Sequence, residues 1–310
     1  MQPRDIDIAN EPSRLVPIDA TLLETLDNDL LIRCASYLDA GGLVQLGRTS
    51  ARLGITQDGQ RRSLVNEAAH QRFRESTTDG ERRCLPKQHE DESDVGLYRA
   101  LELLRRPLCF DKLAGNGFEP QEHPTSVTCT GVGNWSTAMS GHVMRDGRHF
   151  VEFTLYNVER NMPAGVQLGV IRPVSLTGGI DLEADWRGSV NPMSVSSSLK
   201  PAVSEKLRSQ RTAKWVESNV HCCTYYCYNG YCYWRDWDNE KGSSDWQGRE
   251  GLPGSGTIGL LLDLDEGTLS VFMNGRRLGA MKEGLGGEYC WFVAVGVPCT
   301  ISISRGRAPN

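Results

Sequence analysis

The segment from His221 to Trp234, HCCTYYCYNGYCYW, concentrates the side chains that could bind a metal or form a disulfide. Zinc needs thiolate or imidazole ligands that converge tetrahedrally, with paired cysteines about two to four residues apart. This segment lacks a second C-x-x-C pair, and strand alternation directs Cys222 to the face opposite Cys223 and Cys227. We therefore predict that the chain holds no metal and no cofactor.

A cross-strand disulfide is the second chemistry open to this segment. Asn229-Gly230 predicts a two-residue hairpin turn, which places Cys227 opposite Cys232. In a non-hydrogen-bonded pair the two Cα atoms approach closely, so a disulfide is possible there, but it would be strained. A reducing compartment also opposes it. We favour free cysteines that pack as small apolar side chains in a tyrosine-rich sheet.

Motifs of catalysis are missing from the sequence. It contains no G-x-S-x-G and no H-E-x-x-H, and the glycine-rich residues 251–256 lack the lysine and helix that would hold a phosphate. Asp263 and Asp265 could serve glycoside chemistry, although a turn-forming aspartate is the commoner case. A Cys–His nucleophile pair stays open, because such partners need not be close in the chain. We predict a protein that is not an enzyme.

The composition is that of an ordinary globular chain. Its 310 residues predict about two domains, with 39% hydrophobic and 24% charged residues. A formal net charge of -5 argues against nucleic acid as the main partner. No apolar run approaches a bilayer span, and residues 1–7 do not resemble a secretion signal. We expect no membrane partner, a cytoplasmic or nuclear location, and free thiols for the ten cysteines.

Residues 256–279 predict the elements that position these side chains. Two β-type runs, 257–263 and 268–273, are joined by a short turn, and Asn274-Gly275 predicts a tight hairpin after the second run. Leu269, Val271 and Met273 share one face of that run. Short strands alternate with turn residues from Val127 to Ser304, which indicates an antiparallel β-sandwich.

Residues 256–279 resemble a signature of the SPRY domain. The shared features are a strand that ends in Leu-Asp-Leu-Asp, a tight turn, a strand that ends in Asn-Gly, and then a glycine. The segments 147–153 (GRHFVEF) and 169–172 (GVIR) also resemble SPRY strands. The resemblance covers about residues 108–304, within a domain that we place at 108–310. It implies a bent β-sandwich that binds protein partners through loops at one end and has no catalytic machinery.

One segment of that domain, about residues 175–219, is longer than the usual connection after GVIR. It is rich in serine, contains Trp186 and Trp215, and turns basic from Lys200 onward. A loop this long is usually either functional or disordered. Two alternatives stay open: a disordered or loose cover, or a contact surface whose basic side chains suit an acidic peptide.

The N-terminal part predicts short helices. We expect a flexible tail over residues 1–20 and a three-helix unit over 21–60. Asp27, Asp39 and Thr49 or Ser50 are placed to cap the three helices. A helical stripe in the first helix comprises Leu30, Leu31, Cys34, Ala35 and Leu38.

Residues 26–53 resemble an F-box. The matching positions are Leu26, Leu30, Leu31, Ile32, Tyr37, Leu38, Leu43, Leu46, Thr49, Ser50 and Leu53. Asp27 stands where the family prefers proline, and Leu53 where many members have tryptophan. The resemblance implies docking into the Skp-type adaptor of a cullin-based ubiquitin ligase, with its cullin scaffold. The expected contacts are Leu26, Leu30, Leu31, Tyr37, Leu38 and Leu43. The alternative is a helical cap that packs on the second domain.

Residues 61–107 are expected to link the two parts. A helix is predicted over 59–75, and a second helix carries Leu97, Leu101 and Leu104 before Pro107 ends it. Between them lies an acidic loop that we expect to be solvated.

These observations predict a substrate receptor: the helical end docks a ligase adaptor, and the sandwich binds the protein to be ubiquitinated. Exposed aromatic side chains are the expected anchors for that protein, namely Trp135, Tyr231, Trp234 and Trp246. Two alternatives stay open. One is a sandwich protein that binds or acts on glycans, and the other is a SPRY interaction module with no ubiquitin role.

Overall fold

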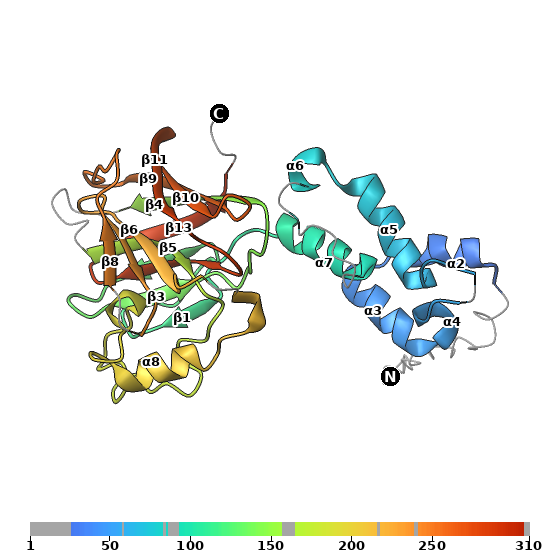
Figure 1. Cartoon of the computed structure of the whole chain (residues 1–310), viewed down its shortest axis with the longest axis horizontal. Coiled ribbons are helices and arrows are strands. Elements are labelled where there is room, and N and C mark those ends of the chain that lie inside the picture. The colour runs from blue at the N-terminus through green and yellow to red at the C-terminus, as the bar shows by residue number, and fades with distance from the viewer. Residues whose placement is uncertain are drawn as a thin grey trace, which may run out of the picture. The chain divides into compact units, whose positions relative to one another are not determined.

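The computed structural model describes residues 26–57, 59–82, 85, 93–156, 165–215, 218–238 and 241–306. The chain divides into two compact units (Figure 1). The helical unit comprises residues 1–76 and 93–99, and the β-unit comprises residues 77–92 and 100–310. The predicted tail over 1–20 and most of the predicted acidic loop lie outside the described residues. Within the described ranges, every helix is too short or too polar to cross a membrane.

The helical unit confirms the predicted series of short helices. They are α2 (Asn28–Ala35), α3 (Ala40–Thr49) and α4 (Ala51–Gly54), which pack against the longer α5 (Leu64–Ser76). The first turns of α7 (Asp94–Arg105) complete the unit. The buried side chains that hold these helices together include Leu31, Ala35, Leu43, Leu53, Leu64, Val65 and Ala68. Short helices are marginal alone, so α5 supplies the apolar surface that they need.

The predicted helix caps are confirmed in part. Asp39 accepts a hydrogen bond from the Gly42 amide at 2.7 Å, and Ser50 accepts one from the Arg52 amide at 3.2 Å. Asp27 precedes α2 but its side chain caps nothing, so that prediction is wrong. The Arg52 guanidinium instead donates to the Leu26 carbonyl and the Asn28 side chain, each at 2.7 Å, and so ties the start of α2 to α4.

Both predicted linking helices form, and the first begins later than predicted. Helix α5 begins at Leu64 rather than Gly59, because the Ser63 hydroxyl accepts from the Asn66 amide, and Gly59 has a φ of +80°. Helix α7 spans the predicted leucines. A further short helix, α6 (Asp79–Arg82), was not predicted.

The β-unit contains two antiparallel sheets, as predicted. In spatial order, sheet A comprises β1 (Lys112–Ala114), β3 (Ser136–Met139), β12 (Cys290–Val295), β5 (Val166–Ile171), β6 (Cys222–Tyr226), β7 (Cys232–Arg235) and β8 (Lys241–Ser244). Sheet B comprises β11 (Arg276–Glu283), β10 (Thr268–Met273), β9 (Gly256–Asp263), β4 (Arg148–Tyr156), β13 (Cys299–Arg305) and β2 (Ser126–Cys129). Strands far apart in sequence therefore lie side by side (Figure 1).

The core between the sheets follows the predicted alternation. Leu269, Val271 and Met273 of β10 are buried there, together with alternate residues of β4. Phe153 of sheet B meets Trp291 of sheet A edge to face, with ring centroids 6.4 Å apart. Apolar residues at every second position of both sheets thus form one continuous core.

The predicted Asn-Gly turn after β10 is confirmed. Asn274 and Gly275 have φ values of 50° and 79°, and Met273 pairs with Arg276 across the two-residue turn. The prediction that the nearby aspartates serve turns is confirmed for Asp263, whose carboxylate accepts from the amides of residues 265 and 266, each at 3.1 Å.

The predicted register of the cysteine hairpin is wrong. Tyr225, not Cys227, lies opposite Cys232, and residues 227–230 form a longer loop. The Cys227 amide donates to the Val166 carbonyl, and the Cys227 carbonyl accepts from the Leu252 amide. These bonds and the full burial of Cys227 hold it in the core between the sheets and take it out of the hairpin ladder.

The cysteines of this hairpin pack as predicted. Cys223, Cys227 and Cys232 lie in the core between the sheets, and Cys222 lies on the opposite face. The Cys223 and Cys232 sulfurs are 3.6 Å apart as free thiols. Burial raises the pKa of the Cys222 and Cys227 thiols well above the usual range. In the described part of the chain, no group of three or more His, Cys, Asp or Glu side chains is placed to hold a metal ion.

The long segment after β5 forms an ordered cover, so the predicted disordered or loose cover is wrong. It contains the turns η2 (Pro192–Ser194) and η3 (Ala213–Trp215) and the helix α8 (Pro201–Arg208) (Figure 1). Trp186, Trp215 and Trp237 are almost completely buried in a second apolar cluster on the outer face of sheet A. We call the residues 175–215 the cover.

Two basic residues of the cover, Lys200 and Lys206, have partners inside it, whereas Arg208 and Lys214 pair with Asp238 and Glu288 outside it. The Lys200 ammonium donates to the carbonyls of Trp186 and Ser189 at 2.8 and 2.7 Å. Lys206 pairs with Asp185 at 2.6 Å. Desolvation by burial lowers the pKa of Lys200 to about 8. These contacts engage Lys200 and Lys206 within the protein, which leaves these two side chains poorly placed to bind an acidic peptide.

Candidate protein-docking surfaces

Exposed apolar side chains lie before α2 at Leu26, on α2 at Leu30, and in the turn that follows it at Tyr37 and Leu38. Four of the six residues predicted to contact an adaptor lie outside, with exposed fractions of 37% for Leu26, 52% for Leu30, 78% for Tyr37 and 37% for Leu38. We call these four residues the α2 surface. Leu31 and Leu43 are buried, at 5% and 0%, and belong to the core of the unit rather than to its surface.

The geometry of α2 and of the turn after it explains why some of the six residues are exposed and others buried. Leu31 and Ala35 are four residues apart and share the inward face of α2, so Leu30 must point elsewhere. The helix ends at Ala35, where the Tyr37 and Leu38 amides donate back to residues 34 and 35. This tight turn presents Tyr37 and Leu38 just before the Asp39 cap of α3.

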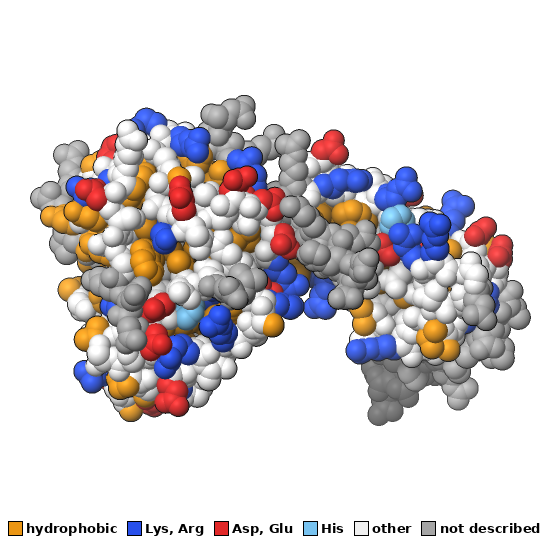
Figure 2. Space-filling view, in the orientation of Figure 1, with side chains coloured by type: hydrophobic (Ala, Val, Ile, Leu, Met, Phe, Trp, Pro, Cys, Tyr) orange, Lys and Arg blue, Asp and Glu red, His pale blue; other side chains and the backbone are white. Residues whose placement is uncertain are grey.

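Charged residues surround the α2 surface. Asp27, Asp29, Arg33 and Asp39 are all solvent-exposed on the same short stretch. Apolar side chains within a polar rim are typical of protein interfaces, and single exposed leucines are not. Figure 2 shows exposed apolar side chains among charged ones on the visible face of the helical unit.

Two of the four aromatic anchors predicted in the β-unit serve packing. Trp246 is only 8% exposed and its indole donates to the Gly230 carbonyl at 2.9 Å, so it holds the cysteine hairpin from inside. We correct its placement from an exposed loop to the core. Trp135 is partly buried against the second apolar cluster, and its backbone bonds to Ser189 and Val190 of the cover.

The other two predicted anchors, Trp234 and Tyr231, are partly exposed on the cysteine hairpin. The Trp234 ring covers Gly242, where a Cβ atom would collide with the indole, and the Lys282 ammonium lies 5.1 Å from the ring centroid. The Arg249 guanidinium lies 4.0 Å from the Tyr231 ring centroid. Both geometries are cation–π contacts.

Three further tyrosines join Tyr231. Ring centroids are 5.9 Å apart for Tyr231 and Tyr233, 5.9 Å for Tyr226 and Tyr233, and 6.2 Å for Tyr226 and Tyr228. Tyr228 is 55% exposed, and burial raises the pKa of Tyr226. We call Tyr226, Tyr228, Tyr231 and Tyr233 the tyrosine surface. Its rings and the adjacent Arg249 are residue types enriched at binding hot spots.

The sequence contained a signal for this surface that our prediction missed. Residues two apart on a strand share a face, which groups Tyr231 with Tyr233 and Tyr226 with Tyr228. The wrong register paired Tyr226 with Tyr233, whereas the Tyr226 amide in fact donates to the Tyr231 carbonyl at 2.9 Å.

Comparison with known proteins finds similarity in structure only. No protein-family model matches the sequence, and no curated protein is similar to it. The SPRY domain of human HERC1 is 15% identical, with a TM-score of 0.41, over 64% of this chain and 98% of that one. The TRIM65 PSpry domain is 14% identical, with a TM-score of 0.39, over 66% and 95%. A human SPRY domain is 8% identical, with a TM-score of 0.36, over 61% and 95%.

Proposed function

We propose that this chain is a non-enzymatic adaptor that joins two proteins, one at each compact unit. The α2 surface would dock a Skp-type adaptor and, through it, a cullin scaffold. The β-unit would bind the protein to be ubiquitinated. Such a receptor would act in the cytoplasm or the nucleus.

The observation that carries the proposal is the α2 surface. Leu26, Leu30, Tyr37 and Leu38 stay exposed although the unit has a core of its own, formed around Leu31 and Leu43. Exposed leucines and a tyrosine within a charged rim have the composition of a helix-face docking site. The sequence resemblance of residues 26–53 to an F-box supplies the identity of the proposed partner.

The tyrosine surface supports the second half of the proposal. Tyrosine contributes a large contact area with little loss of side-chain entropy, and its hydroxyl can bond to a partner's backbone. Tyr228 is half exposed at the tip of the hairpin, and Arg249 stacks on Tyr231 beside it. A protein target fits such a surface better than a small molecule, which requires a deeper pocket.

The test is reconstitution of the full chain with a purified Skp-type adaptor. The wild-type chain should bind, and the double variant Leu30→Asp, Leu38→Asp should lose binding because charge replaces two of the proposed anchors. Leu199→Asp is the matched control, since Leu199 is 54% exposed in the β-unit and receives the same change. If neither the wild type nor the control binds the adaptor, the ligase role is excluded. Binding of a target by the tyrosine surface would then favour an interaction module with no ubiquitin role.

A further inference from the structure

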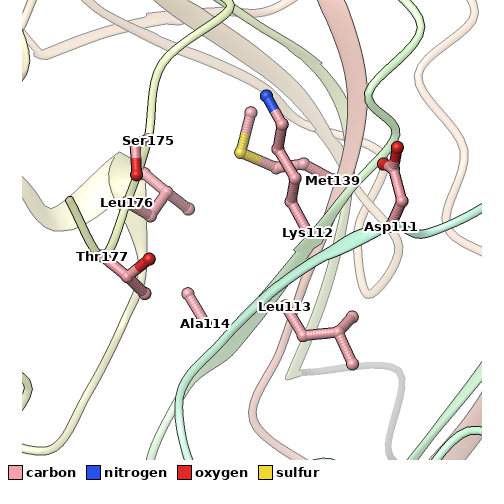
Figure 3. A pocket seen from close by; sticks show the side chains of 8 residues that line it. All are labelled: Asp111, Lys112, Leu113, Ala114, Met139, Ser175, Leu176 and Thr177. Atoms are coloured by element: carbon pink, nitrogen blue, oxygen red, sulfur yellow. The ribbon is translucent and has the colours of Figure 1, made fainter.

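A pocket opens at the β1 edge of sheet A, whereas the tyrosine surface lies on β6 and β7 towards the other edge of that sheet. It has a volume of about 310 Å³ and is lined by residues 111–114, Met139 and residues 175–177 (Figure 3). Figure 3 shows Ser175, Leu176 and Thr177 on one side, Lys112, Met139 and Asp111 on the other, and Ala114 between them. Ala114, Met139 and Leu176 are buried, so they give the pocket an apolar floor.

The strand beside the pocket is an edge strand. β1 pairs with β3 on one side only and is the first strand of sheet A. Lys112 and Leu113 are exposed, and β1 shares no backbone hydrogen bond with residues 175–177 among the bonds of the described residues. An edge strand presents unpaired N–H and C=O groups that can accept another strand.

Residues 175–177, the wall of the pocket across from β1, are fixed in place by Gln210. The Gln210 side chain accepts from the Ser175 amide at 2.7 Å and donates to the Ser175 carbonyl at 3.0 Å. The Ser175 hydroxyl accepts from the Gly178 amide at 2.8 Å. Because the backbone of Ser175 is engaged, a strand that enters this space would pair with β1 rather than with the wall.

The two charged side chains of the pocket, Lys112 and Asp111, differ in whether they have a partner. The Lys112 side chain is exposed and, within the described part of the chain, its ammonium has no ion pair or hydrogen-bond partner. The Asp111 carboxylate lies at the far end of the pocket and accepts a hydrogen bond from the Gly141 amide. The cation at the mouth is therefore available to a ligand, and the hydroxyls of Ser175 and Thr177 lie across from it.

We propose that this edge binds an extended segment of a partner protein, which adds to β1 as a further strand and carries an aliphatic residue and, two positions away, an acidic one. Alternate side chains of an added strand point to the same face, so one of them reaches the apolar floor. The carboxylate two positions away shares that face and pairs with Lys112, which lies on the same face of β1 as Ala114. A pocket at the small end of the range for ligand sites suits one side chain better than a cofactor.

The test selects peptides from a displayed library of random linear peptides, using the full chain as bait. Enriched peptides should combine Leu, Ile or Val with a nearby Asp or Glu. Dissociation constants are then measured by fluorescence anisotropy. Lys112→Glu should weaken binding by roughly tenfold or more, because it sets like charges against each other. Repeating the selection on Lys112→Glu should replace the acidic residue by Lys or Arg.

Two further variants separate this site from general charge effects. Thr177→Trp places a large ring at the exposed mouth of the pocket and should weaken binding as strongly as Lys112→Glu. Arg277→Glu makes the same reversal of charge on β11, an edge strand of sheet B, and should leave binding unchanged. Hydrogen exchange should slow at residues 112–114 when the peptide is bound.

Three outcomes would overturn the proposal. One is a selection that enriches no peptide over the library background. Another is a set of peptides that bind wild type, Lys112→Glu and Thr177→Trp equally. The third is protection from exchange at the cysteine hairpin with none at β1. None of these outcomes bears on adaptor binding, so this proposal and the proposed function fail separately.

Discussion

The helical unit exposes its predicted contact residues more fully than the β-unit does. In the helical unit, four of the six predicted contacts lie outside. In the β-unit, Trp246 lies in the core, Trp135 packs under the cover, and Tyr231 and Trp234 are only partly exposed. A helix of eight residues can turn only one stripe inward, so a leucine-rich sequence must expose the rest. A two-sheet core with a cover buries any large aromatic ring that it can reach.

The comparison teaches how to interpret apolar residues in a sequence without a structure. An excess of leucine over what a small unit can bury indicates a docking surface. A tryptophan in a large β-domain indicates packing, because burial of its ring contributes more to stability than exposure would. The tyrosines of the hairpin fall between these cases, since their hydroxyl groups can stay in water.

Trp246→Ala gives the largest expected effect. If Trp246 is a core residue, its loss should destabilise the β-unit by about 3–5 kcal/mol, from the cavity and the lost bond to Gly230. Urea denaturation followed by far-UV circular dichroism measures this change. Tyr228→Ala is the control on the same hairpin and should change stability by less than about 0.5 kcal/mol. If the two variants lost the same stability, Trp246 could not be distinguished as a core residue from Tyr228 on the surface.

Leu31→Ala and Leu30→Ala make the same comparison within α2. Leu31→Ala should destabilise the helical unit by about 2–5 kcal/mol, since Leu31 is almost fully buried. Leu30→Ala should cost less than about 0.5 kcal/mol and yet weaken adaptor binding. Thermal unfolding and a binding titration on the same samples separate the two roles. A large loss of stability from Leu30→Ala would mean that Leu30 belongs to the core.

Parts of the fold could be predicted because local chemistry decided them. Asn274-Gly275 allowed only a tight turn, and the alternation of Leu269, Val271 and Met273 required a buried face. Asn229-Gly230 gave the same local pattern but a different result. There the backbone of Cys227 bonds to residues 166 and 252, so contacts distant in sequence overrode the turn preference.

The cover was beyond a prediction from spacing, and spacing groups the tyrosines of the hairpin without giving their cross-strand pairing. The cover has a polar, serine-rich sequence, and three tryptophans that are separated in the chain fix it through burial on sheet A. Two of them, Trp186 and Trp215, lie in the predicted insert, but Trp237 follows the hairpin. The pairing of Tyr226 with Tyr231 depends on a register that the loop at 227–230 sets. In both cases the deciding contacts join segments that the sequence alone does not bring together.

Asp39→Ala tests the caps of the helical unit. Asp39 accepts the Gly42 amide at 2.7 Å, and its loss should cost about 1 kcal/mol in the unfolding of that unit. Asp27→Ala is the matched control, because Asp27 makes no cap bond before α2. Differential scanning calorimetry of the two variants measures the difference. A larger effect from Asp27 than from Asp39 would contradict the assignment of the caps.

The smallest expected effect on stability comes from the partly exposed ion pair of Glu81 with Arg105. The hydrogen bond from Arg105 lowers the pKa of Glu81 from 4.5 to about 2. A carboxyl group whose pKa is lower in the folded state stabilises that state above its unfolded pKa, so this contribution is lost as the pH falls from about 4.5 towards 2. Both side chains are partly in solvent, so we expect it to be less than about 1 kcal/mol. Carbon-13 NMR of Glu81 should follow the titration, and Arg105→Gln should return the pKa towards 4.5. A pKa that stays near 2 in that variant would assign the shift to the other donor, Thr78, whose amide and hydroxyl also bond to Glu81.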